Sequence, residues 1–123
     1  MTTFVETKEF SKWQPRFLPG DAYAELQKEL IASPQKGDVM PGCGGLRKLR
    51  ITDPKRQKGK RGGARLIYLH IPEADQFYLL DIYGKGEKDD LTPVEKKDLR
   101  QLARAYKRLI VEAARKAHKE QEP

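Results

Sequence analysis

Apolar and polar positions divide the chain into alternating runs and segments with helical spacing. In GLRKLRI, Leu49 and Ile51 alternate with Lys48 and Arg50, which is typical of a strand with one buried face. The runs ARLIYLHI and QFYLLDIY are rich in β-branched and aromatic residues, and only the turn PEAD separates them. Strands this close in sequence pair antiparallel. We therefore predict a meander of strands over residues 46–52, 64–71 and 76–83.

The N-terminal third predicts one edge strand and two helices. TFVETK, residues 3–8, alternates in part and favours an edge strand. In FSKWQPRF, Ser11 is a candidate cap for a brief helix, and Pro15 restricts that helix to a first turn or interrupts it. Apolar residues at i, i+3 and i+7 then predict a helix over about 21–32, which Pro34 ends. The stretch QKGDVMPGCGG has no periodicity and is expected to be a loop.

The C-terminal third carries the clearest helix signal. In TPVE, Thr92 is a candidate cap and Glu95 occupies the position of a capping-box acid. The apolar stripe that follows consists of Leu99, Leu102, Tyr106, Leu109 and Ala113. This spacing predicts a helix of roughly 25 residues that covers one face of the sheet. The tail 115–123 has few apolar residues and is expected to project from the domain or to fray.

These elements fit one domain spanning 1–123, of α+β class, in which two N-terminal helices and one long C-terminal helix flank a small antiparallel sheet. No apolar run reaches the roughly 18 residues of a membrane span, and the N-terminus lacks the features of a signal peptide. We therefore expect a cytoplasmic protein. The single cysteine, Cys43, cannot form an internal disulfide, and no Cys/His cluster has metal-binding spacing, so neither metal nor cofactor is expected.

The net charge of +7 is unevenly distributed. Residues 46–66 hold nine Lys/Arg and one acid, whereas the rest of the chain holds 16 Lys/Arg and 17 Asp/Glu. A local excess of this kind is typical of a polyanion-binding surface. The connection 55–63 is too long for a tight hairpin and is expected to be a mobile basic loop. A solvated basic hairpin that binds nothing is the competing interpretation.

The candidate chemistry is phosphate binding by arginine and lysine, with an aromatic ring to stack on a base. Lys48, Arg50 and Arg65 would form the cationic side of a strand pair, which Tyr83 and Lys85 would approach from the third strand. His70 and His118 lie in a strand and in the helix tail, so acid-base catalysis by paired histidines is poorly supported. A lysine crowded by cations would be one alternative base. The acids Glu87, Asp89 and Asp90 would bind a metal or, more simply, form a solvated turn.

Three segments in this order resemble the HigB branch of the RelE superfamily of bacterial type II toxins. They are GGLRKLRI, GKRGGARLIYLHI and FYLLDIYGKGEKDDLT, followed by a long helix. The resemblance covers roughly residues 40–110. It implies a RelE-like microbial ribonuclease fold and an endoribonuclease (mRNA interferase) that cleaves translated mRNA in the ribosomal A site of the 30S subunit by attack of the 2′-hydroxyl, which inhibits translation and growth. It also implies a helix-turn-helix antitoxin as partner, and contact with operator DNA only through the antitoxin complex.

The resemblance assigns the family's basic strand residues to Lys48 and Arg50, and the arginine of its R-L-Y motif to Arg65. An arginine and a tyrosine of the RelE branch meet Gly86 and Thr92 here. Their roles would fall to Tyr83, Lys85 or Lys88. The residues expected to bind RNA are Arg47, Lys55, Arg56, Lys58, Lys60, Arg61 and Lys88. The alternative function is a non-catalytic RNA- or ribosome-binding protein of the same fold. A DNA-binding regulator is disfavoured because no helix carries the basic cluster of 46–66.

Overall fold

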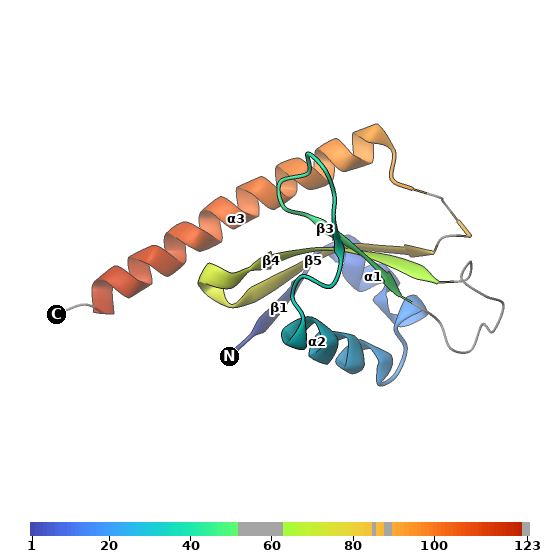
Figure 1. The fold of residues 1–123 in the computed structure, drawn as a ribbon, viewed down its shortest axis with the longest axis horizontal. Coiled ribbons are helices and arrows are strands. Elements are labelled where there is room, and N and C mark those ends of the chain that lie inside the picture. The colour runs from blue at the N-terminus through green and yellow to red at the C-terminus, as the bar shows by residue number, and fades with distance from the viewer. Residues whose placement is uncertain (52–62, 85, 88–89, 122–123) are drawn as a thin grey trace.

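The computed structural model describes residues 1–51, 63–84, 86–87 and 90–121. A central sheet lies between two layers of helix (Figure 1). The strands are β1 (Thr3–Glu6), β2 (Asp38–Val39), β3 (Arg47–Ile51), β4 (Ala64–Ile71) and β5 (Gln76–Gly84). The helices are α1 (Lys8–Phe17), α2 (Ala22–Ala32), the 3-10 turn η2 (Pro72–Ala74) and α3 (Pro93–Gln121). The predicted α+β arrangement of two N-terminal helices and one long C-terminal helix is confirmed.

The sheet has the strand order β1-β5-β4-β3-β2. β3, β4 and β5 form the predicted antiparallel meander, and β1 pairs with β5 in the parallel sense. The stretch that we expected to be a loop contains β2, in which Asp38 pairs with Lys48 and Val39 with Arg47. A strand of two residues is too short to show alternation, so the sequence pattern could not reveal it.

One face of the sheet packs against α1 and α2. The predicted N-terminal cap of α1, Ser11, was wrong. Thr7 caps this helix, since its hydroxyl accepts from the Phe10 N–H, whereas the Ser11 hydroxyl donates to Glu6. Pro15 lies inside the last turns of α1, so the helix is longer than the brief one expected. The core on this side joins strand and helix residues, among them Leu49, Leu66, Phe77 and Leu79 with Phe10, Leu18, Leu26 and Leu30.

The other face of the sheet lies under α3. The capping box of this helix is confirmed: Thr92 N–H donates to Glu95 Oε1 at 2.9 Å, and Glu95 N–H donates to Thr92 Oγ1 at 3.1 Å. α3 runs to Gln121, so of the two expectations for its last turns, projection and fraying, the helix is consistent with projection. Those turns extend past the β4–β5 hairpin (Figure 1). The strand residues buried on this side include Ile67, Leu69, Ile71, Tyr78 and Leu80.

The buried stripe of α3 differs from the predicted one. Leu102 and Leu109, which we expected in the stripe, are 43% and 64% exposed. Both spacings step by three and four residues, so periodicity alone did not distinguish them. Ala103 is fully buried, and its small side chain lets the helix approach the sheet closely. The residues that pack toward the sheet include Leu99, Ala103, Tyr106 and Ile110.

Candidate functional site

A row of polar side chains crosses the sheet where β4 begins and β5 ends. Arg50 pairs with Arg65 across β3 and β4, and Arg65 pairs with Tyr83 across β4 and β5. Directly opposite residues of antiparallel strands project to the same face, so these three side chains share the α3 face of the sheet. Arg50 and Arg65 therefore lie on one side of the strand pair, as predicted, and the register places them directly opposite each other. We call Arg50, Arg65 and Tyr83 the cross-strand row.

A second row lies beside the first. Lys48 pairs with Ile67, and Ile67 pairs with Asp81 on β5. Because side chains two positions apart on a strand share a face, Lys48 lies next to Arg50 as predicted. Asp81 is only 9% exposed and adds a buried carboxylate to the same face. Asp81 was not among the predicted site residues, although its position two residues before Tyr83 is a sequence signal for the same face.

Asp90 joins Lys48 to the start of α3. One carboxylate oxygen of Asp90 lies 3.5 Å from Lys48 Nζ, and the other lies 3.2 Å from Lys96 Nζ. The side chains of all three residues are between a third and a half exposed, so solvent reaches both ion pairs. We call Lys48, Asp90 and Lys96 the ion bridge. Lys48 is thus partnered by a carboxylate.

The backbone holds Asp90 in this position. Leu91 N–H donates to Asp90 Oδ1 at 2.7 Å, and the Leu91 side chain is buried in the core beneath α3. That backbone hydrogen bond is the main reason why the pKa of Asp90 lies below its ordinary value, with Lys96 and Lys48 adding to the effect. Asp90 is therefore a carboxylate at neutral pH.

Tyr83 and Arg65 are the least exposed members of the cross-strand row, at 5% and 7%. Burial raises the pKa of Tyr83 to about 12, and the negative charge of Asp90 acts in the same direction, while Arg65 partly opposes it. The phenol therefore keeps its proton throughout the physiological range. Arg65 Nη1 donates to the Ala64 carbonyl at 3.3 Å, which orients the guanidinium at the entrance of β4.

Arg47 belongs to the opposite face of β3. Its guanidinium donates to the backbone carbonyls of Gly37 at 2.7 Å and Gln35 at 3.3 Å. These bonds fasten the segment after α2 to the sheet. We therefore interpret Arg47 as a structural residue, separate from Lys48 and Arg50.

Several expected site residues lie outside the part of the chain that the structure describes. Among the acids after β5, Glu87 forms an ion pair with Arg16 of α1, and Asp90 belongs to the ion bridge. Asp89 is outside the described residues. Within the described ranges, no group of three His, Cys, Asp or Glu residues could hold a metal ion. Residues 55–62 of the predicted basic loop 55–63 also lie outside the described ranges. The expected site residues outside these ranges are Lys55, Arg56, Lys58, Lys60, Arg61, Lys85 and Lys88.

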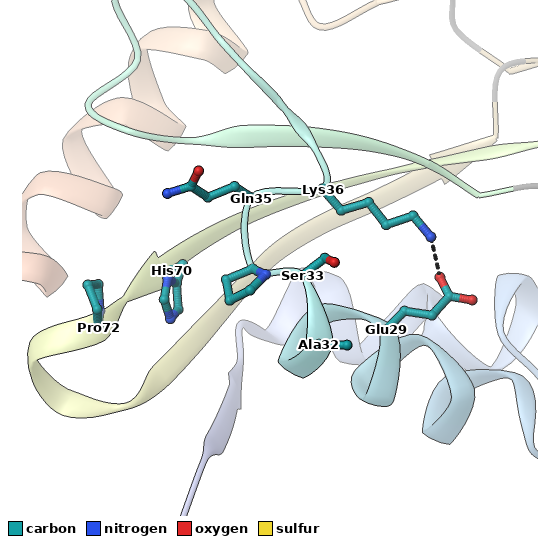
Figure 2. A pocket seen from close by; sticks show the side chains of 8 residues that line it. Glu29, Ala32, Ser33, Gln35, Lys36, His70 and Pro72 are labelled. Atoms are coloured by element: carbon teal, nitrogen blue, oxygen red, sulfur yellow. Dashed lines mark hydrogen bonds and ion pairs between the residues drawn. The ribbon is translucent and has the colours of Figure 1, made fainter.

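A separate groove of about 780 Å³ lies on the other side of the sheet (Figure 2). It is formed by the end of α2, the following segment and the far end of β4, and Lys36 and Glu29 pair across its rim at 3.0 Å. His70, which lines it, stacks on Phe77, and burial lowers the pKa of His70. Because its Lys and Glu neutralise each other and its imidazole is neutral, this groove is poorly suited to bind phosphate. The cross-strand row is the better candidate site.

Two solved structures illustrate what the chain resembles, and no model of a protein family matches it. A mutant of the E. coli toxin RelE in the free state is similar, with 15% identity, a TM-score of 0.49, and coverage of 72% of this chain and 87% of that one. The intact E. coli RelBE toxin-antitoxin complex is similar at 19% identity and a TM-score of 0.48, covering 68% of this chain and 96% of that one.

The described residues combine the elements needed to bind and polarise a phosphodiester. Arg50 and Lys48 offer exposed or half-exposed positive charge, and Arg65 adds a largely buried guanidinium behind them. A guanidinium donates two parallel hydrogen bonds to phosphate oxygens, whereas an ammonium supplies a compact charge. Tyr83 adds a proton donor.

No helix of the described chain has the length and apolarity that a membrane crossing requires.

Proposed function

We propose that this chain is the toxin of a type II toxin-antitoxin system, of the HigB branch of the RelE superfamily. It acts as an endoribonuclease on translated mRNA in the ribosomal A site, in the cytoplasm. Its partners are the ribosome, the message and a helix-turn-helix antitoxin that neutralises it. Support comes from the sequence motifs of residues 40–110 together with the side chains that these motifs bring to one face of the sheet.

The cross-strand row is the observation that carries the proposal. Arg50, Arg65 and Tyr83 lie on adjacent strands in direct register, with Lys48 two positions from Arg50. Two positive charges and a proton-bearing phenol on neighbouring strands match a phosphate that gains negative charge during reaction. A solvated basic surface would not require a buried arginine beside a buried tyrosine.

In the proposed reaction, the 2′-hydroxyl of a ribose loses its proton to solvent water while its oxygen forms a bond to the adjacent phosphorus, and the bond from phosphorus to the 5′-oxygen of the next nucleotide breaks. The products are a 2′,3′-cyclic phosphate and a free 5′-hydroxyl. Lys48 and Arg50 bind the non-bridging oxygens, and Arg65 stabilises the pentacoordinate state from behind. Tyr83, which stays protonated at neutral pH, gives its proton to the departing 5′-oxygen and regains a proton from the solvent.

Expression of the chain from an inducible promoter, with primer extension on a translated message, tests this function. We expect growth arrest and new message ends inside the reading frame. Arg65→Ala is expected to relieve both effects, whereas Lys28→Ala, on the exposed side of α2, is expected to relieve neither. Message that stays intact in arrested cells would contradict the endonuclease assignment.

A non-catalytic RNA- or ribosome-binding protein of the same fold is the second candidate. The observation that favours it is the capping box. In it, the Thr92 side chain accepts from the Glu95 N–H, and the Glu95 side chain accepts from the Thr92 N–H. Thr92 therefore offers no substitute for the tyrosine of the RelE branch, and Gly86 offers none for its arginine. For this candidate, binding to ribosomes with steep salt dependence would occur without any new message ends.

A further inference from the structure

Charge on α3 is segregated around the helix axis. Residues 93–121 contain nine Lys/Arg and four Asp/Glu. Because successive residues are rotated by about 100°, eight of the cations fall in a sector of about 140° and all four acids fall outside it. The eight cations, called here the basic flank, are Lys96, Lys97, Arg100, Arg104, Lys107, Arg108, Arg115 and Lys119. The acids outside it are Glu95, Asp98, Glu112 and Glu120.

The basic flank lies on the β3 side of α3. Arg100 Nη1 donates to the Gly42 carbonyl at 3.3 Å, and a Cβ placed on Gly44 would lie 3.2 Å from Arg104 Cγ. Both contacts are with the segment that leads into β3, which rises toward α3 in Figure 1. The positive charge of α3 therefore faces the same side of the molecule as the exposed residues of β3.

The ion bridge makes the basic flank continuous with the candidate site. Lys96, the first cation of the flank, shares the Asp90 carboxylate with Lys48. From Lys96 to Lys119 the flank extends for about 35 Å at about 1.5 Å per residue. The cations of the flank thus begin beside the candidate site and continue along α3, whose last turns extend beyond the β4–β5 hairpin (Figure 1).

The spacing within the flank is unfavourable for an isolated helix. Lys96, Arg100, Arg104 and Arg108 follow one another at intervals of four, so each faces a like charge one turn away. Like charges at this spacing destabilise a helix by about 0.2–0.5 kcal/mol per pair. A merely solvated surface intersperses the two signs along a face. This arrangement is consistent with an anionic partner that offsets the repulsion.

We propose that the basic flank of α3 binds the phosphate backbone of RNA outside the segment held at the cross-strand row. The inference rests on the proposed function, because it takes RNA to be the occupant of the adjoining site. Continuity with that site favours RNA over an acidic protein surface. The flank contributes affinity and salt dependence, and it leaves the chemistry of bond cleavage to the cross-strand row.

Fluorescence anisotropy with two labelled oligouridylates, one of about 4 and one of about 20 nucleotides, tests the proposal. The variant Arg108→Glu/Arg115→Glu changes two exposed cations of the flank. The control Lys28→Glu/Lys116→Glu changes the net charge equally, but Lys28 lies on α2 and Lys116 lies outside the flank. We expect the flank variant to bind the long RNA at least about tenfold more weakly than the control does, with the short RNA bound equally by both.

The salt dependence gives a second measurement. Each lost phosphate contact lowers the slope of log K against log salt by about 0.7 for a single strand, so the flank variant should lose about 1.4 on the long RNA. Arg108→Gln/Arg115→Gln, which removes charge without reversing it, should show the same slope. Equal weakening by the flank and control variants would reduce the effect to net charge and overturn the proposal. If the flank variant lost as much affinity for poly-glutamate as for RNA, the assignment of RNA as the ligand would be overturned.

Failure of this inference is distinguishable from failure of the proposed function. Cleavage of a translated message by the flank variant, with unchanged binding of the long RNA, would overturn the flank and leave the toxin function intact. Absence of cleavage by the unaltered chain, with the expected loss of binding in the flank variant, would overturn the catalytic function alone.

Discussion

Arg65 and Tyr83 face each other directly across β4 and β5, and both side chains are almost fully buried. In the proposed reaction, this arrangement would place a cation and a proton-bearing phenol beside one phosphate. Neighbouring carboxylates raise the pKa of the phenol further, whereas Arg65 lowers it. The pair therefore combines charge stabilisation with a retained proton, and each of these properties has its own consequence.

Tyr83→Phe is expected to lower the rate of message cleavage by about 10²-fold and to leave RNA binding nearly unchanged, because the variant lacks only the proton donor. Since the pKa of Tyr83 is about 12, activity of the unaltered chain should not fall through loss of this proton between pH 7 and 9. Rates of cleavage measured across that range, with Tyr106→Phe as the control, test both statements. A Tyr83→Phe enzyme as active as the Tyr106→Phe enzyme would exclude the acid role.

Asp90→Asn should lower the free energy of unfolding by about 1 kcal/mol near neutral pH, because it removes two half-exposed ion pairs and weakens the hydrogen bond from Leu91. The folded-state pKa of Asp90 lies below its unfolded value of 3.8, so this contribution is present above pH 4 and disappears as the pH falls further. Urea titrations at pH 6 and pH 3 measure it. Asp38→Asn, at an exposed position on β2, is the matched control. If Asp90→Asn lowered the free energy of unfolding by the same amount at pH 6 and at pH 3, the result would contradict the ion bridge.

Tyr68→Phe should destabilise the protein by about 1–3 kcal/mol. The buried Tyr68 hydroxyl donates to the Pro34 carbonyl at 2.8 Å and accepts from the Gly37 N–H at 3.0 Å, so the variant leaves two backbone groups without this partner. Tyr106→Phe, which loses one half-buried bond to Gln76, should cost less. Denaturant unfolding of the two variants gives the comparison, and equal costs would show that the Tyr68 bonds contribute no more than the single bond of Tyr106.

The stability of the protein should fall as the pH is lowered from 7 toward 5, and His70 should account for part of that fall. Burial holds the pKa of His70 below its ordinary 6.5, so the unfolded chain takes up the proton first on acidification. His70→Gln should therefore reduce the pH dependence of the free energy of unfolding, measured by denaturant titrations between pH 5 and pH 7. Identical pH profiles for the unaltered chain and His70→Gln would contradict this attribution.

The sequence was sufficient for most of the sheet because alternation also determines which side chains share a face. Lys48 and Arg50 could be placed together, and the motif order brought Arg65 to the same surface. Asp90 and Lys96 could not be found in this way, because their contact with Lys48 depends on where α3 crosses the sheet. Similarly, Leu102 and Ala103 of α3 fit helical spacing equally well. Only the packing of α3 on the sheet shows that Ala103 is buried and Leu102 is exposed.

The excess of positive charge in the segment 46–66 can be counted from the sequence, whereas the charge distribution around α3 cannot. The remaining residues nearly balance in total, which conceals the excess of cations on α3 because acids between Glu73 and Asp90 compensate for it. Summed charge ignores direction, whereas a helix displays its residues around an axis. The basic flank therefore became visible only once the limits of α3 were known.

Cleavage of a message on programmed ribosomes by the purified chain tests the central claim most directly. In single-turnover reactions followed by primer extension, the unaltered chain should cut within the reading frame. Arg65→Ala and Lys48→Ala should each slow cleavage by about 10²–10³-fold, the usual cost of removing one group that stabilises a developing negative charge. Lys36→Ala, at the separate groove, should cut at the unaltered rate. Cleavage by both site variants at the rate of Lys36→Ala would contradict the assignment of the cross-strand row and Lys48 as the active site.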